Sequence, residues 1–126
     1  MTKRIGLVAA LLGIVSVGTA YAGRRATSPV SVSTSSKFAT GFLGTARNAA
    51  GTVAYIGCAN DSDSNGTCYA ITESGVGAAC VTQSSTMLAT IRSITPNSRV
   101  TFKWDDSGNC TYVGVTNYSS NEVIQP

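Results

Sequence analysis

The sequence predicts a β-dominated α+β fold: an antiparallel sheet of about five to six strands, one short helix and two disulfides. Short apolar stretches alternate with turns rich in Gly, Asn, Asp and Ser, which is typical of strands joined by tight turns. Only one segment has apolar residues at helical spacing, and the chain carries four cysteines. An antiparallel sheet with a helix on one face is the simplest arrangement for that order.

Residues 1–22 have the pattern of an export signal. Lys3 and Arg4 precede an uncharged run that ends in a small-residue cleavage motif, Ala20-Tyr21-Ala22. The alternative is a membrane anchor, but a helical span needs about 20 apolar residues and this run is shorter. We therefore expect a mature chain that starts at Gly23, has no membrane span, and is secreted or periplasmic.

The mature chain has no electrostatic basis for nucleic-acid binding. Two of the nine basic residues lie in the signal, so seven remain against six acidic residues. Binding to nucleic acid needs a clustered basic face, and the only adjacent basic pair of the mature chain is Arg24-Arg25. We expect no nucleic-acid partner.

One domain is expected over residues 37–118. Residues 23–36 are rich in Ser, Thr and small residues, so they form either a flexible N-terminal segment or an edge strand around Val30 and Val32. Residues 119–126 are expected to form a C-terminal tail.

The first strands are predicted from short apolar stretches bounded by turn residues. They cover residues 38–46, 52–58, 68–72 and 76–81. Turn signals at 47–51 and 74–75 and a polar loop at 59–67 separate them.

The predicted helix follows these strands. Ser84 or Ser85 can accept hydrogen bonds from the free N–H groups of its first turn. Apolar side chains then recur on one helical face, and the residue before Pro96 is disfavoured in a helix, so the helix ends there. The apolar face consists of Met87, Leu88, Ile91 and Ile94.

The last hairpin has the clearest strand pattern. Residues 99–104 alternate polar and apolar side chains, which places Val100, Phe102 and Trp104 toward the core. The turn 105–109 needs a residue at positive φ, and Gly108 is suited to it. Residues 110–118 form the return strand.

The four cysteines predict two disulfides, because small exported domains oxidise their thiols. Three pairings are open. We favour Cys58–Cys68 with Cys80–Cys110, since the first pair flanks a turn-rich loop. A zinc site made of four thiolates is the alternative, but the spacing has no C-x-x-C pair.

Three strings resemble a known kind of protein. Ala46-Arg47-Asn48-Ala49-Ala50 and Tyr55-Ile56-Gly57-Cys58, with Cys110-Thr111-Tyr112-Val113 later in the chain, resemble small secreted four-cysteine bacterial domains. The resemblance implies an exported bacterial domain and no particular activity.

Enzymatic chemistry is poorly supported by the residue types present. The chain has no His, so activation of a Ser or Cys nucleophile by imidazole is excluded. Four of the six acidic residues lie in two turn segments, where Asp is expected for conformational reasons. We expect a protein that is not an enzyme and has no cofactor.

One string has the spacing of metal ligands. Asp61, Asp63 and Asn65, followed by Gly66, match the first half of a calcium loop. The twelfth position is Thr72, whereas a calcium loop uses a bidentate Glu there. We therefore interpret the string first as a structural turn and only second as a weak calcium site.

The strand aromatics are the other candidates for a site. Exposed Trp and Tyr side chains anchor partners, so Trp104, Tyr112 and Tyr118 are candidate binding residues for a protein or carbohydrate partner. Filling the core is the alternative for Trp104. Tyr112 and Tyr118 share a parity with Cys110, opposite to Val113, and the sequence does not decide which set faces inward.

Three functions follow from these observations. The first is an exported, non-enzymatic binding or structural module of the envelope or extracellular space. The second is an inhibitor of an extracellular protease or lysozyme that uses the loop 59–67 as a rigid wedge. The third is a weak calcium-binding module. The oligomeric state is not predicted.

Overall fold

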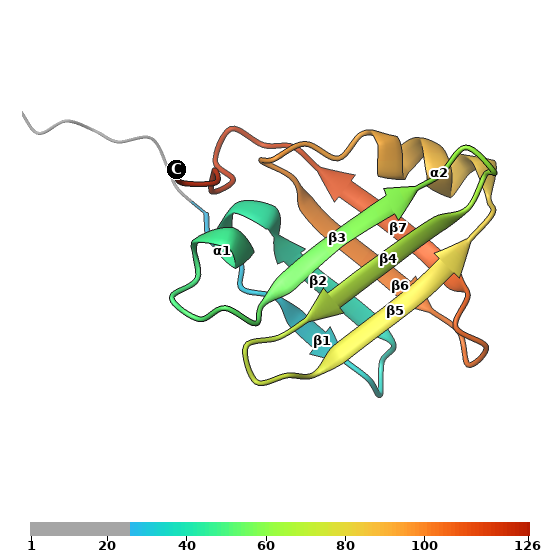
Figure 1. The fold of residues 1–126 in the computed structure, drawn as a ribbon, viewed down its shortest axis with the longest axis horizontal. Coiled ribbons are helices and arrows are strands. Elements are labelled where there is room, and N and C mark those ends of the chain that lie inside the picture. Colours follow the sequence, from blue (N-terminus) through green and yellow to red (C-terminus); the bar gives the residue numbers. More distant parts are fainter. Residues whose placement is uncertain (1–25) are drawn as a thin grey trace, which may run out of the picture.

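Two antiparallel sheets pack face to face and cross each other (Figure 1). The computed structural model describes residues 26–126, so the predicted export signal lies outside the described residues. One sheet has four strands in the order β1-β2-β6-β7, and the other has three in the order β3-β4-β5. The predicted β-dominated α+β class is confirmed, but the strands divide into two layers instead of one sheet.

The strands are short, and two helices interrupt them. The strands are β1 (Ser31–Ser33), β2 (Phe38–Phe42), β3 (Tyr55–Asn60), β4 (Gly66–Ile71), β5 (Gly77–Thr82), β6 (Arg99–Trp104) and β7 (Cys110–Thr116). The helices are α1 (Leu43–Asn48) and α2 (Ser85–Arg92).

Each helix lies where the chain passes from one sheet to the other. α1 follows β2 of the four-stranded sheet and leads to β3, and α2 follows β5 and leads back to β6. The predicted strand over residues 38–46 is therefore wrong beyond Phe42. A helix of six residues is too short to show apolar periodicity, which is why sequence reasoning missed α1.

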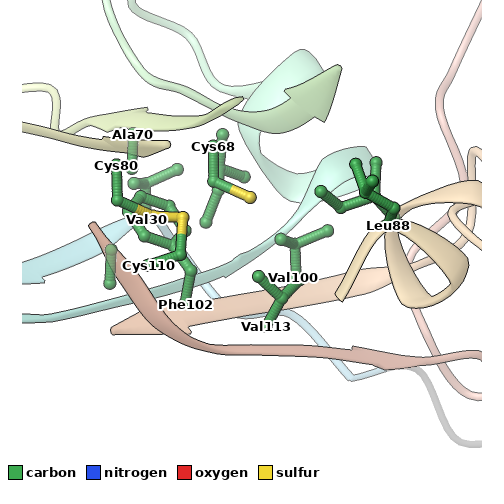
Figure 2. Packing of buried hydrophobic residues seen from close by; sticks show 12 residues of the cluster. Val30, Cys68, Ala70, Cys80, Leu88, Val100, Phe102, Cys110 and Val113 are labelled. Atoms are coloured by element: carbon green, nitrogen blue, oxygen red, sulfur yellow. A yellow bond between two sulfur atoms is a disulfide. The ribbon is translucent and has the colours of Figure 1, made fainter. Parts of the chain in front are cut away.

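The core lies between the sheets and is built from alternating side chains (Figure 2). In β6, Val100 and Phe102 are fully buried, as predicted from the strict alternation. Trp104 is only partly buried and packs against this core, with its ring centroid 5.8 Å from that of Phe102. The apolar faces of the two sheets thereby cover each other, as in other sandwiches.

A bulge changes the side-chain parity at the start of β7. Trp104 pairs with Cys110 and Lys103 pairs with Tyr112, so Thr111 is the extra residue. Cys110 and Val113 are therefore both buried while Tyr112 is exposed. The parity argument from the sequence, which grouped Tyr112 with Cys110, fails for this reason.

α2 closes one end of the space between the sheets. The Ser84 hydroxyl accepts a hydrogen bond from the Met87 N–H, which confirms the predicted cap. Leu88 and Ile91 are buried. They pack so closely on Gly66 that a Cβ there would lie 2.8 Å from the Leu88 side chain. The absence of a side chain at Gly66 lets the helix approach.

Both favoured disulfides are present. Cys58–Cys68 joins opposite residues of β3 and β4, and Cys80–Cys110 joins β5 to β7 of the other sheet. Figure 2 shows the second bond spanning the layers. Because all four thiols are oxidised, the zinc alternative has no thiolate ligands.

Both ends of the described segment, residues 26–126, are attached to the domain. Val32 of β1 pairs with Ala39, so the open choice for residues 23–36 resolves to an edge strand at 31–33. The residues expected to form a C-terminal tail include the buried Asn121, and the Asn48 side chain donates to the Val123 carbonyl. Within residues 26–126, neither helix is long and apolar enough to cross a membrane.

Candidate functional site

The outer face of the three-stranded sheet carries no charged side chain. Each strand offers three outward positions, and the register aligns them in three rows across the sheet. The rows are Tyr55-Ile71-Gly77, Gly57-Tyr69-Ala79 and Ala59-Thr67-Val81. We call this surface the tyrosine face. Tyr55, Tyr69 and Val81 are 56%, 41% and 52% exposed, so large apolar area is open to solvent.

Each of the two tyrosine hydroxyls on this face lies beside a glycine. The Tyr55 hydroxyl lies 3.4 Å from the point where a Cβ at Gly57 would stand, and the Tyr69 hydroxyl lies 3.7 Å from that point at Gly77. The ring centroids are 5.9 Å apart, within the range of favourable aromatic contacts. Both rings therefore contribute to one exposed aromatic patch.

Acidic residues border the tyrosine face at both ends. Asp61 and Asp63 lie in the loop that joins β3 to β4, and Glu73 follows β4 at its other end. All three side chains are exposed. An uncharged centre with a charged border is the usual composition of a protein–protein interface.

The predicted aromatic candidates do not form one surface. Trp104 faces the core, whereas Tyr112 lies on the outer face of the four-stranded sheet. There the Lys103 ammonium lies 5.6 Å from the Tyr112 ring centroid. Tyr118 is 67% exposed beyond the end of β7, about 20 Å along the chain from Tyr112 at the rise of an extended strand.

The sequence also places Tyr55 and Tyr69 on predicted strands, but the selected binding candidates did not include them. A signal was available, because Tyr69 directly follows Cys68 on β4. A cysteine whose disulfide faces the core forces its neighbour on a strand to face outward. Applied to Tyr69, this alternation places its ring on the solvent side.

The predicted calcium ligands form a closed turn. One Asp61 oxygen accepts hydrogen bonds from the backbone N–H groups of Asp63 and Asn65, and the other accepts from the Asn65 amide. The backbone N–H of Asn65 lowers the pKa of the Asp61 carboxyl, with smaller contributions from the Asn65 amide and the Asp63 N–H.

The glycine of this string has a different role from the one expected. In a calcium loop the glycine allows a sharp turn. Here the residue at positive φ is Ser64, with φ of 63°, and Gly66 is the first residue of β4 under α2. The resemblance to a calcium loop therefore covers the spacing of three side chains and not the backbone path.

A cleft opens between the two sheets beside the edge strand β1. Its volume is about 820 Å³. α1, β1 and the turn between β4 and β5 lie on this side of the molecule (Figure 1). We call it the β1 cleft. Its apolar lining includes Val30, Val32, Ala46, Ala54 and Val76, and its polar lining includes Glu73 and Glu122.

Comparison with known proteins adds no relatives. No protein-family model matches this sequence, and no curated protein or solved structure is significantly similar to it.

Proposed function

We propose that the protein is an exported, non-enzymatic binding module whose tyrosine face docks on a partner protein. The observation that carries the proposal is the absence of charge from every outward position of β3, β4 and β5. Contiguous apolar surface of this kind is uncommon on isolated soluble domains and marks sites of interaction. Depletion of charge and enrichment of Tyr are typical of the centre of an interface.

The geometry favours a protein over a carbohydrate. Sites for small polar ligands are concave and bring several polar groups together. The polar side-chain groups of the tyrosine face are only the hydroxyls of Tyr55, Tyr69 and Thr67, and its other outward positions are apolar or Gly. An apolar patch on another protein complements it better than a sugar does.

The acidic border specifies the partner further. With Asp61 and Asp63 at one end and Glu73 at the other, a partner with basic residues around its own apolar patch gains favourable contacts and faster association. Two disulfides support the same role, since a surface held rigid before binding has little entropy left to lose.

A matched pair of substitutions tests this proposal. Ala79→Arg places a cation at the middle of the tyrosine face, and Ala89→Arg places one at an exposed position of α2. The proteins are immobilised and exposed to native envelope and extracellular fractions, and retained components are identified by mass spectrometry. We expect a protein that is retained by the wild type and by Ala89→Arg but not by Ala79→Arg.

Other results would redirect the assignment. Equal retention by both variants would exclude the tyrosine face as the docking site. Binding to a polysaccharide that Ala79→Arg abolishes would replace the protein partner by a carbohydrate. Dimerisation of the purified protein, lost in Ala79→Arg, would make a second copy the partner.

Inhibition of an extracellular protease or lysozyme is the second candidate. The loop 61–65 is braced by the Cys58–Cys68 disulfide and by the Asp61 hydrogen bonds, which favours a rigid wedge. Its exposed side chains are small or acidic, so none has the size of the usual interface anchors. We rank it second, and activity assays over a panel of proteases and lysozymes test it directly.

A further inference from the structure

The β1 cleft has the size and lining of a small-ligand site. Its volume of about 820 Å³ lies within the range of ordinary ligand pockets, roughly 300–1,000 Å³. Valines from β1 and the segment before it form one wall, and Ala46 of α1, Ala54 and Val76 form the others. A site of this kind buries an apolar body and uses a few polar groups to orient it.

One carboxylate is held in place at the rim of the cleft. Glu73 Oε1 accepts a hydrogen bond of 3.1 Å from the backbone N–H of Ala54. The carboxylate lies against Gly51, where any Cβ would come within 1.9 Å of Oε2. A glycine at 51 therefore makes room for the carboxylate, and the side chain bridges from the β4–β5 turn to the segment before β3.

The described lining of the cleft carries two carboxylates with different surroundings. The described lining residues include two carboxylates, Glu73 and Glu122, and neither Lys nor Arg. Glu122 accepts hydrogen bonds from Thr45 and Asn48, which tie it to α1.

We propose that the β1 cleft binds a small ligand with an apolar body and a single cationic group, such as an alkylammonium. The apolar body lies between the sheets, and the cation contacts Glu73 at the rim. An anionic ligand of the same shape is repelled by Glu73 and is disfavoured. A neutral one gains the apolar contacts alone.

This site is separate from the centre of the proposed docking surface, although Glu73 also lies at the border of that surface. The cleft opens between the layers, whereas the tyrosine face is the outer side of one sheet. The Ala79→Arg variant, which blocks that face, leaves every described lining residue of the cleft unchanged. Failure of one proposal therefore does not decide the other.

Three probes with the same eight-carbon chain separate the contributions of apolar body and charge. Octylammonium, 1-octanol and octanoate are titrated into the full mature protein at neutral pH and low salt, below their aggregation limits. Backbone amide shifts in two-dimensional NMR give the affinity and the location of binding. We expect octylammonium to bind more tightly than 1-octanol by up to about fivefold, the size of an exposed ion pair. Octanoate binds more weakly than either.

Two charge-removing variants complete the test. Glu73→Gln keeps an oxygen for the Ala54 N–H and removes the charge, whereas Asp63→Asn removes one charge from the distant β3–β4 loop. We expect Glu73→Gln to abolish the preference for octylammonium over 1-octanol and Asp63→Asn to preserve it. Thermal melting of both variants verifies that the fold is intact.

Three outcomes would overturn the proposal. The first is equal binding of the three probes, or binding of none. The second is a preference for octylammonium that persists in Glu73→Gln. The third is a set of shifted amides that excludes residues 27–32, 45–49 and 72–76.

Discussion

Two hairpin loops of this protein have the same conformation although only one resembles a metal site. The loop 61–65 joins β3 to β4, and the loop 105–109 joins β6 to β7. Each starts with Asp and ends with Asn. The Asp N–H donates to the Asn carbonyl at 3.0 Å in both, and one Asp oxygen accepts from the N–H groups two and four residues later. In both, the Asn amide donates to the other Asp oxygen.

The two loops differ at the position that needs positive φ. Ser64 occupies it in the first loop, with φ of 63°, and Gly108 occupies it in the second, with φ of 80°. They also differ in their surroundings. Asn65 accepts from the Gln83 amide, whereas the Gly108 carbonyl accepts from the Val81 N–H of β5.

Their likeness shows what the Asp and Asn residues do. The loop 105–109 has Ser107 where the loop 61–65 has the Asp63 carboxylate, yet it forms the same hydrogen bonds. The conformation of the loop 61–65 therefore follows from an Asp that caps two N–H groups, and it requires no cation.

The largest expected effect is the loss of folding stability on removal of a disulfide, and it differs between the two hairpins. Cys58–Cys68 closes 10 residues within one hairpin, and Cys80–Cys110 closes 30 residues and ties the second hairpin to the other sheet. Chain entropy predicts a loss of about 2.5 kcal/mol for Cys58→Ala with Cys68→Ala. The same model predicts about 3.5 kcal/mol for Cys80→Ala with Cys110→Ala.

Urea denaturation of the two double variants measures this difference. A total stability of about 5–15 kcal/mol leaves each variant folded in the cold. A larger loss from the Cys58–Cys68 pair would show that constraint of the unfolded chain is not the dominant contribution.

The two loops should also make the stability of the protein depend on pH in the same way. The backbone N–H of Asn65 lowers the pKa of Asp61, and the backbone N–H of Asn109 lowers that of Asp105. A carboxyl whose pKa is lower in the folded state than in the unfolded state stabilises the fold. This stabilisation is complete at pH values above the unfolded pKa of about 3.9, and it is lost as the pH falls through the folded pKa. We expect the free energy of unfolding to decrease as the pH is lowered from about 4.

Substitution of both carboxylates tests that pH dependence. Asp61→Asn with Asp105→Asn keeps an acceptor oxygen at each loop but removes the titrating group, so the stability curve between about pH 4 and pH 2 should flatten. An Asp63→Asn variant, which leaves both Asp61 and Asp105 in place, is the control. An unchanged slope in the double variant would contradict the role assigned to the two loops.

A smaller effect comes from exchanging the residues at positive φ. We expect Ser64→Gly to stabilise the protein by about 0.5–1 kcal/mol, because Gly adopts this conformation without a steric cost. Gly108→Ser should destabilise it by a similar amount, since no atom lies within 4 Å of the added Cβ and only the backbone is strained. Chemical denaturation of both variants and of the double exchange measures the balance. A double exchange far from neutral would show that the loops are not equivalent.

The smallest expected effect is that of calcium. A ligand at 100 times its Kd would add about 2.7 kcal/mol and raise Tm by several degrees. We predict no rise in Tm with millimolar calcium and no fall with a chelator, measured by thermal melting. A calcium-dependent rise that Asp61→Ala with Asp63→Ala abolishes would make the loop 61–65 a metal site and distinguish it from the loop 105–109.

Some candidate sites were accessible from sequence and others were not. The string at 61–65 was recognised as a turn, because its hydrogen bonds join residues at most four positions apart. The tyrosine face needed the register of three strands, and the β1 cleft needed residues from opposite ends of the chain. The pairing that aligns Tyr55 with Ile71 and Gly77 is set by which faces are buried, and not by any one strand.

The sequence alone established the features that depend on residues close together along the chain. The strict alternation at residues 99–104 corresponds to β6 at both ends, and Ser84 and Gly108 occupy the predicted cap and positive-φ positions. These features depend on side chains and N–H groups within a few residues, which the chemistry of each residue already specifies. The oxidation of all four cysteines likewise agrees with the expectation from their even number.

Only the tertiary structure decided how the strands divide into layers. β2 pairs with β6 rather than with β3. Ala39 and Phe102 are therefore partners on neighbouring strands although they are far apart in sequence. Two apolar faces bury each other more completely than one face under a single helix, and α1 and α2 carry the chain between them. The bulge at Thr111 and the close approach of Leu88 to Gly66 arise from the same packing. They depend on which surfaces meet, and the order of residues along one strand does not contain that information.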